Sequence, residues 1–224
     1  MTEQPAKASD SEILQILTTE HNNLQAIRSG TIYESAGRTT LYLGAVSSSL
    51  VALAFIGQIS EMGNAFIVFA LILLPSLIFL GVVTFIRVYQ TGTEDMVASR
   101  GINRIRHYYV EVAPQLEKYF ILSSHDDMKG VLANMGVQKQ GWWQLFVSTH
   151  GLVGVINSIL AAVFAGLVST TFLNVTMALA VAVGIIVFAI SELLHFRYQN
   201  TAYEASEKNL KVLFPTEINH PTEG

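Results

Sequence analysis

Residues 65–86 read AFIVFALILLPSLIFLGVVTFI, and this stretch decides the fold. It contains no Asp, Glu, Lys or Arg, and Arg87 closes it. An α-helix needs about 20 mostly apolar residues to cross a hydrocarbon core of about 30 Å, because each residue adds about 1.5 Å. The stretch therefore predicts a membrane-spanning helix.

Neighbouring stretches predict three more spans. Residues 39–60 are uncharged, and a short polar break at residues 61–64 separates them from the first stretch. Residues 140–191 also lack Asp, Glu, Lys and Arg. That run is too long for one crossing and suits two crossings joined near residues 169–171. The sequence thus predicts an all-α polytopic membrane protein with four transmembrane helices in two hairpins.

The composition agrees with a protein whose solvent is the bilayer. The chain is 51% hydrophobic and 13% charged, which lies outside the usual range for a soluble domain. The absence of cysteine excludes a disulfide framework, a thiolate metal site and a cysteine nucleophile. A net charge of -4 without a long basic run argues against a nucleic-acid partner. No cleaved signal peptide is expected, so the first span is predicted to direct insertion.

The basic residues predict the orientation of the spans. All 13 Lys and Arg residues lie before the first span, between the hairpins or after the last span, and the hairpin tips have none. Basic flanks favour the cytoplasmic side. Trp142, Trp143 and Tyr198 lie where aromatic residues of the inner interface are expected. We therefore expect a multi-pass protein of the bacterial inner membrane with both termini in the cytoplasm.

This topology divides the chain into five segments. They are a cytoplasmic N-terminal amphipathic helix at 1–38, transmembrane hairpins at 39–87 and 142–197, a cytoplasmic helical connector at 88–141, and a cytoplasmic tail at 198–224. Ser9 and Glu12 have the spacing of a capping box at the start of the first helix.

Periodic apolar residues predict further helix in the connector. Residues 93–121 show the clearest helical period of the chain, and Pro114 is expected to kink or break that helix because it lacks a backbone donor. Burial within one subunit and a seam between subunits both fit this pattern. Residues 123–139 predict a loop with at most a short helix, and disorder is expected after Pro215.

Small residues recur every four positions in two of the spans. They are Gly44, Ser48 and Ala52 in the first span and Gly154, Ser158, Ala162 and Gly166 in the third. Small side chains let helices approach closely in a bilayer, where lipid is as apolar as leucine. We expect these positions to be helix-packing or pore-lining, with the first and third spans inside the bundle and the greasier second and fourth outside.

Two single residues inside the spans carry structural predictions. Pro75 removes a backbone hydrogen bond of the second span, which predicts a kink. A gating hinge is the functional alternative to a proline that only shapes the helix. Asn157 lies well inside the third span and is expected to bond across a helix interface, as structural glue rather than as an ion ligand.

One cluster of ionisable residues is a candidate metal or proton site. Glu192 and His195 are three residues apart near the cytoplasmic end of the fourth span, so they share a helix face. His150 is expected at a similar depth, and Glu20 and His21 would join if the N-terminal helix folds beneath the bundle. Carboxylate and imidazole groups suit a divalent metal or a proton response. The pattern lacks the second Glu-x-x-His of di-iron bundles, and no cofactor is predicted.

Several segments carry a resemblance to known proteins. They are LTTEH at 17–21 with RS at 28–29, VALA at 51–54, NRIRHY at 103–108, APQLEKYF at 113–120 and HDD at 125–127. These segments resemble a family of uncharacterised bacterial, actinobacterial-type, four-span integral membrane proteins, which implies the fold but no activity. Asn22 stands where that family is expected to have an aromatic residue. The layout is also similar to helical-hairpin membrane effectors of bacterial defence systems, which implies oligomerisation and permeabilisation of the inner membrane.

The motifs that are absent narrow the function. No nucleotide-binding loop, serine-hydrolase elbow or zinc-protease helix occurs, so no enzyme activity is expected. A transporter usually places polar groups at mid-depth, whereas an oligomeric channel can use serines and small residues. The leading hypothesis is a homo-oligomeric channel or pore-type protein in the lipid bilayer. A non-conducting scaffold or sensor with a cytoplasmic protein partner, and a metal- or proton-linked transporter, remain alternatives.

Overall fold

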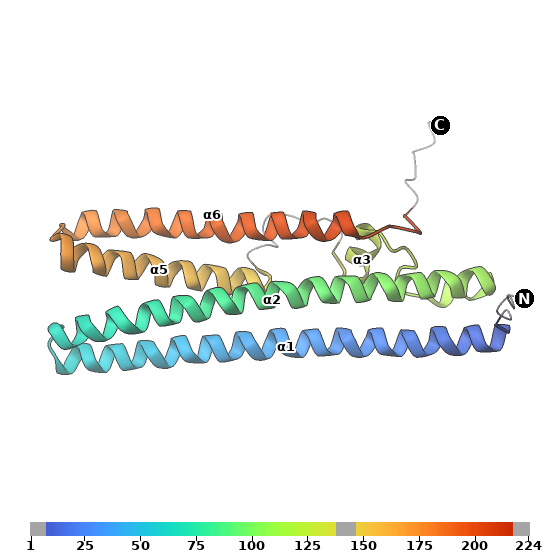
Figure 1. Cartoon of the computed structure of the whole chain (residues 1–224), viewed down its shortest axis with the longest axis horizontal. Coiled ribbons are helices and arrows are strands. Elements are labelled where there is room, and N and C mark those ends of the chain that lie inside the picture. The colour runs from blue at the N-terminus through green and yellow to red at the C-terminus, as the bar shows by residue number, and fades with distance from the viewer. Residues whose placement is uncertain (1–7, 138–146, 217–224) are drawn as a thin grey trace, which may run out of the picture. The chain divides into compact units, whose positions relative to one another are not determined.

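The computed structural model describes residues 8–137 and 147–216, and within these ranges the chain is helical and contains no strand. The long helices are α1 (Asp10–Ile59), α2 (Asn64–Val112), α5 (Thr149–Leu173) and α6 (Met177–Asn209), as labelled in Figure 1. Each of the four is long and apolar enough to cross a membrane. The predicted all-α class with four helices of membrane-spanning length is therefore confirmed.

The chain divides into two compact units, which are described separately. We call them the apolar unit, with residues 33–92 and 141–209, and the polar unit, with residues 1–32, 93–140 and 210–224. The predicted hairpin segments 39–87 and 142–197 both fall within the apolar unit. Trp142 and Trp143 lie outside the described residues.

The predicted N-terminal helix and the first predicted span lie on one helix, because α1 runs without interruption from Asp10 to Ile59. No proline occurs in this segment, and the glycines within it weaken a helix only by about 1 kcal/mol each. The capping box is present at its start. The Ser9 N–H donates to Glu12 Oε2 at 2.8 Å, and the Glu12 N–H donates to Ser9 Oγ at 3.4 Å.

The connector helix is likewise the continuation of α2, which ends at Val112. A short 3-10 helix, η1 (Pro114–Tyr119), follows, and Pro114 occupies its first turn. Proline is tolerated there because the first N–H groups of a helix have no partner within it. The predicted break at Pro114 is confirmed. The predicted short helix in the next segment is α3 (Met128–Asn134).

The turn between α1 and α2 lies at the polar break predicted from the sequence. Glu61 and Met62 have φ values of 50° and 59°, in the left-handed region. The Met62 N–H donates to the carbonyl oxygen of Gly57 at 2.8 Å and closes the end of α1. A Cβ on Gly63 would lie 2.7 Å from the carbonyl oxygen of Ser60, so this close approach requires glycine.

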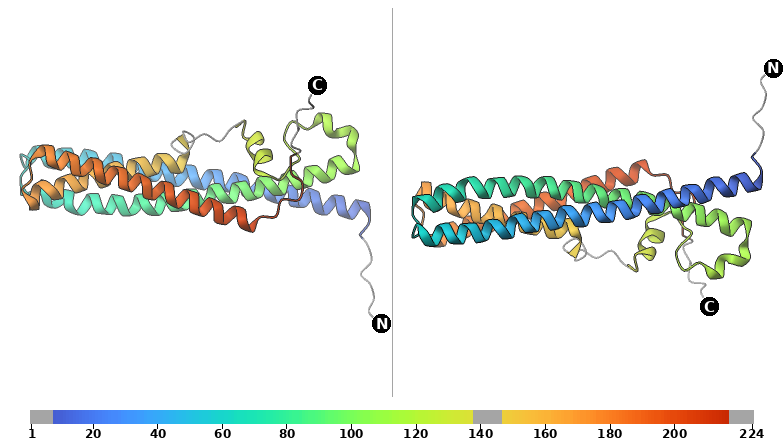
Figure 2. Two further views of the ribbon diagram at one scale, coloured as in Figure 1. Left: turned by 90° about the horizontal axis from the view of Figure 1, so that it is seen from above. Right: turned by 90° about the horizontal axis from the view of Figure 1, so that it is seen from below.

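The turn between α5 and α6 lies later than residues 169–171. The hydroxyls of Ser169 and Thr170 donate to the carbonyls of Ala165 and Gly166, so these polar residues stay inside the helix. The turn begins at Asn174, whose φ of 50° and ψ of 34° place it in the left-handed region that Asn tolerates. Figures 1 and 2 show α5 and α6 side by side and antiparallel.

The core of the apolar unit draws on α1, α2 and α5. Its buried residues are Tyr42, Val46 and Leu53 of α1, Ala70, Leu74, Leu77 and Phe85 of α2, and Val153 and Leu160 of α5. Within the most apolar 18-residue window of each helix, the buried share is 33% in α5, 22% in α1 and in α2, and 11% in α6. The third predicted span is thus the inner one and the fourth the outer one. The second span was expected to lie on the outside of the bundle and the first on the inside. That expectation is wrong for the second span, because α2 supplies much of the core.

Candidate functional site

Two predicted site histidines of the apolar unit pack against one phenylalanine. The ring of Phe85 meets His195 edge-on at a centroid distance of 4.5 Å and His150 edge-on at 6.5 Å. His150 also meets the ring of Tyr89 at 5.5 Å, and the Tyr89 hydroxyl donates to the carbonyl oxygen of Gln199 at 3.0 Å. Aromatic contacts of this kind hold ring orientation. Both imidazoles therefore belong to an aromatic cluster.

His195 also ends a small polar chain between α5 and α6. Its Nδ1 lies 2.8 Å from the carbonyl oxygen of Ser191 and 3.5 Å from Ser158 Oγ. Ser158 is fully buried and donates to Ser191 Oγ at 2.8 Å. Because a carbonyl oxygen only accepts, Nδ1 carries the proton in this arrangement. The Nδ1 atom is then unable to bind a metal.

The metal site predicted from Glu192, His195 and His150 stays a prediction. Within residues 8–137 and 147–216, no three His, Asp or Glu side chains are arranged to hold a metal ion. The physical reason is that both imidazoles turn toward Phe85, and His195 uses Nδ1 for its own helix. Glu192 Oε1 is buried and has no hydrogen-bond partner among the described residues.

The other two residues considered for that cluster, Glu20 and His21, lie on α1 in the polar unit. Burial lowers the pKa of His21, and the nearby charge of Arg106 lowers it further. The imidazole is therefore neutral at pH 7. Its Nδ1 is buried without a hydrogen-bond partner in the described part of the chain.

Gly81 of α2 is closely approached by the polar side chains of Asn157 from α5 and Tyr42 from α1. A Cβ on Gly81 would lie 2.2 Å from Asn157 Oδ1 and 2.7 Å from the Tyr42 hydroxyl. Both side chains are buried, and neither atom has a hydrogen-bond partner among the described residues. Asn157 lies at an interface between helices, and its Oδ1 makes no hydrogen bond across that interface to any described residue. The space left by Gly81 admits the amide, and no sequence pattern marks that glycine.

The small residues of α5 are packing positions. Gly154 is buried, and a Cβ there would meet Phe85 at 3.4 Å and His195 at 3.5 Å. Farther along, α5 and α6 approach so closely that a Cβ on Gly184 would lie 3.2 Å from the carbonyl oxygen of Ala162. A Cβ on Gly166 would lie 3.6 Å from the carbonyl oxygen of Ala180. The α5 ridge therefore faces other helices of the same chain, as expected of packing positions.

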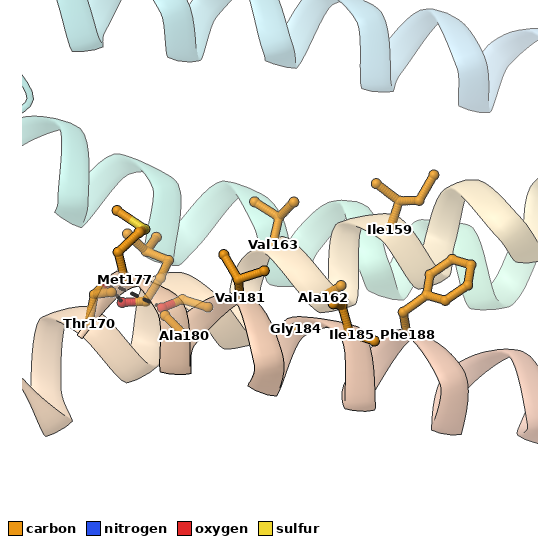
Figure 3. Close-up of a pocket in the computed structure, with 12 residues that line it drawn as sticks. Ile159, Ala162, Val163, Thr170, Met177, Ala180, Val181, Gly184, Ile185 and Phe188 are labelled. Carbon is orange, nitrogen blue, oxygen red and sulfur yellow. Dashed lines mark hydrogen bonds between the residues drawn. The ribbon is translucent and has the colours of Figure 1, made fainter. Parts of the chain in front are cut away.

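An apolar groove of about 630 Å³ lies between α5 and α6, and Figure 3 shows the side chains along it. Ile159 and Val163 line it from α5, and Val181 and Phe188 line it from α6. The Thr170 hydroxyl at one end donates to the carbonyl oxygens of Gly166 and Leu167 within its own helix. The groove is an apolar surface feature whose lining suits contact with acyl chains.

The small residues of α1 lie differently. Gly44 and Ser48 are exposed, Ala52 is half-buried, and a Cβ on Gly44 would meet nothing within 4 Å. The Ser48 hydroxyl donates to the carbonyl oxygen of Gly44 at 2.9 Å. The described residues thus leave this ridge uncovered. Pro75 lies inside α2, which continues through it, and its role as a hinge stays a prediction.

The polar unit contains a binding arrangement that no sequence pattern predicted. Asp126 is 0% exposed and accepts from the N–H groups of Leu213 and Phe214 at 3.0 and 2.8 Å. It also accepts from Arg104 Nε at 2.7 Å, while its own N–H donates to the carbonyl oxygen of Phe214 at 3.1 Å. A second Arg104 nitrogen donates to the carbonyl oxygen of Lys211.

Asp127 holds the next part of the same tail. It caps α3 by accepting from the Gly130 N–H at 2.8 Å, and it accepts from the Thr216 N–H at 3.0 Å and hydroxyl at 2.9 Å. Burial alone would raise the pKa of Asp126 and Asp127, but hydrogen bonds from backbone N–H groups outweigh it and hold each pKa below its usual value. Both carboxyls are therefore ionised at neutral pH.

Asn103 fixes the segment that precedes these carboxylates. It is 0% exposed, and its Nδ2 donates to the carbonyl oxygen of His125 at 2.7 Å. Its Oδ1 accepts from Arg106 Nη1 at 3.0 Å and from Asn134 Nδ2 at 2.8 Å. We call Arg104, His107, Asp126 and Asp127, together with the tail they hold at residues 211–216, the C-terminal clasp.

The clasp bears on the expected disorder of the tail at one residue, Thr216. Disorder was expected after Pro215, yet Thr216 is held by Asp127; residues 217–224 lie outside the described residues. The NRIRHY and HDD segments that carry the resemblance supply the side chains of the clasp. Comparison of the chain with family models, with curated proteins and with solved structures gives no match.

Proposed function

We propose that the chain is a homo-oligomeric channel or pore-type protein of the bacterial inner membrane, in which α1 forms the seam between subunits. The uncovered face of α1 carries this proposal. Gly37, Gly44 and Val51 are exposed and lie seven residues apart, so they share one face of the helix. Tyr42 and Leu53 lie on the opposite face and are buried.

The chemistry of that face favours another protein surface over lipid. Thr40, Ser47 and Ser48 are exposed beside the glycines, so the face carries small and hydroxyl side chains. Helices in a bilayer associate through such residues, since lipid offers no hydrophobic advantage over leucine. Hydroxyls and small residues are also adequate to line an oligomeric pore. On α6, by contrast, large apolar side chains such as Ile185 and Leu194 are exposed and suit contact with acyl chains.

The same proposal includes the two-hairpin topology with the polar unit in the cytoplasm. It is supported by the placement of the basic residues and by a charged cluster in the apolar unit. Glu34 accepts from Arg87 Nε and Nη2 at 2.8 and 2.9 Å, and from Arg38 Nε at 2.8 Å. Arginine paired with carboxylate in this two-bond geometry suits the boundary between hydrocarbon and water.

Cysteine crosslinking tests the seam, and the natural chain is free of cysteine. Gly44→Cys and Ser48→Cys are each expected to give disulfide-linked dimers in native membranes, because equivalent faces of α1 meet between subunits. Non-reducing gel electrophoresis measures the dimer fraction. The control is Leu50→Cys, at a position that is 51% exposed on another face of α1. Equal crosslinking at Leu50 and at the seam positions would refute the proposed interface.

Conductance tests the pore. The purified wild-type protein is expected to conduct in planar bilayers, and Ser48→Trp is expected to abolish most of the current because its bulk keeps the α1 seam from closing. Ile185→Trp on α6, where the side chain is 64% exposed, is the matched control and should leave the current unchanged. Silence of the wild type across voltage, pH and divalent ions would rule out the channel. Assembly without conductance would instead support the alternative of a non-conducting scaffold.

A further inference from the structure

The C-terminal clasp recognises an extended backbone. Asp126 takes two consecutive tail N–H groups, Asp127 takes a third, and Arg104 reaches the carbonyl oxygen of Lys211. Only two tail side chains are engaged in described contacts. The ring of Phe214 stacks on His107 at 3.8 Å, and the Thr216 hydroxyl donates to Asp127. Backbone hydrogen bonds with a few side-chain pockets are the usual way a protein binds an extended peptide.

The tail is held locally rather than buried. Val212 and Leu213 are 38% and 46% exposed, so a large part of their apolar surface stays open although the tail is in place. Removing it from the clasp costs a small set of hydrogen bonds, one ring stack and the partial burial of these side chains. Segments with few buried apolar contacts open with a lower free energy than core helices do. The clasp has the properties of an exchangeable contact.

We propose that Arg104, His107, Asp126 and Asp127 form a peptide-binding site that residues 211–216 occupy in cis and block. Its ligand class is an extended peptide with an aromatic residue, a proline and then a hydroxyl residue, as in the resident sequence KVLFPT. The proposal does not depend on channel activity. It makes the tail a competitor of any peptide with the same pattern.

The charges around the site define what the ligand must offer. Asp126 and Asp127 supply negative charge and are matched by Arg104 and by the nearby His125. His107 lies 3.5 Å from Glu111 and stacks on Phe214, and the tail itself brings Lys211. An ionised aspartate accepts hydrogen bonds and donates none. The ligand must therefore present backbone N–H groups at residues equivalent to Leu213, Phe214 and Thr216.

The position of the tail gives the site a mechanical consequence. The last residue of α6 is Asn209, and the clasp takes hold of the chain at Lys211. Exchange of the tail for another peptide would release the segment that directly follows α6. Through chain connectivity alone, occupancy of the site thus sets how far the C-terminal end of this helix is restrained.

Hydrogen exchange of the full chain in lipid nanodiscs tests the resident contact. The amides of Leu213, Phe214 and Thr216 are expected to be protected, and Asp126→Asn is expected to speed exchange at Leu213 and Phe214 on the order of tenfold or more, since bonds to a charged acceptor are strong. Glu117→Gln, an exposed acid on η1, is the matched control and should change nothing. Equal exchange in wild type and Asp126→Asn would overturn the proposal.

Binding in trans tests the site itself. The full-length variant Leu213→Pro/Thr216→Pro lacks two tail donors but keeps the site, so a labelled acetyl-KVLFPT peptide is expected to bind it, as measured by fluorescence anisotropy. The wild type, whose site is occupied, should bind at least tenfold more weakly by mass action. A peptide with alanine in place of phenylalanine should also bind more weakly. No binding to the variant, or equal binding to both proteins, would overturn the proposal.

Discussion

Gly130→Ala is expected to destabilise the polar unit by about 3 kcal/mol, the upper part of the range for overpacking a filled site. A Cβ at this position would lie 2.2 Å from the carbonyl oxygen of His125 and 2.9 Å from its carbonyl carbon. These are backbone atoms, and Asn103 anchors them through its hydrogen bond to the same oxygen. The chain would have to shift beside Asp126, which is 0% exposed, so the clasp would lose its geometry.

The measurement is hydrogen exchange of the α3 amides together with denaturant titration of the full chain in nanodiscs. Gly30→Ala is the matched control in the same unit, because a Cβ there meets nothing within 4 Å. Alanine should stabilise that helix position by about 1 kcal/mol. A Gly130→Ala protein as stable as the wild type would show that the His125 carbonyl moves freely, contrary to its anchoring by Asn103.

The long helices could be predicted from the sequence because their signal is local. Runs of apolar residues without charge give length directly, and the polar break at residues 61–64 marks a turn. The extent of α1 was harder to predict. A change from polar to apolar composition near residue 38 resembles a boundary, yet a helix continues through such a change unless proline or a cap ends it.

The clasp could not be predicted because it has no local signal. Arg104, Asp126 and Phe214 come from three distant parts of the chain, and their contacts are side chain to backbone. The sequence of the tail shows no apolar period and predicts no contact for residues 211–216, and disorder is expected after Pro215. Only the tertiary structure supplies the two carboxylates that bind its N–H groups. The capping role of Asp127 is the one part with a local pattern, since Asp often precedes a helix.

The surroundings of Glu192, His195 and His150 depend on packing that the sequence does not show. Helical spacing places Glu192 and His195 on neighbouring turns of α6, but it gives no information on the partners of the His150 and His195 rings. Phe85 belongs to an apolar run whose residues cannot be told apart by their sequence pattern. Its contact with both histidines is therefore visible only in the folded structure. The small-residue ridges show the same limit. Spacing identifies a face, while burial decides whether it packs within the chain, as for Gly154, or stays open, as for Gly44.

Gly81→Ala is expected to destabilise the apolar unit by about 2 kcal/mol, within the range for overpacking. The added Cβ would lie 2.2 Å from Asn157 Oδ1, 2.6 Å from its Cγ and 2.7 Å from the Tyr42 hydroxyl. Asn157 is 2% exposed and Tyr42 is 1% exposed, so neither side chain has solvent to move into. Denaturant titration in mixed micelles measures the loss. Gly92→Ala on the same helix, where a Cβ meets nothing within 4 Å, is the control and should not lose stability.

A double-mutant cycle identifies the cause of that loss. If the clash with the amide is responsible, Gly81→Ala costs much less in an Asn157→Ala background, and the coupling energy is on the order of 1 kcal/mol or more. Tyr42→Phe in the wild-type background should be neutral or stabilising by about 1 kcal/mol, because it removes a buried hydroxyl without a partner among the described residues. Additive effects of Gly81→Ala and Asn157→Ala would contradict the contact, and a loss of stability in Tyr42→Phe would show that the hydroxyl is bonded. The cycle thereby tests whether glycine at position 81 exists to admit an amide between three helices.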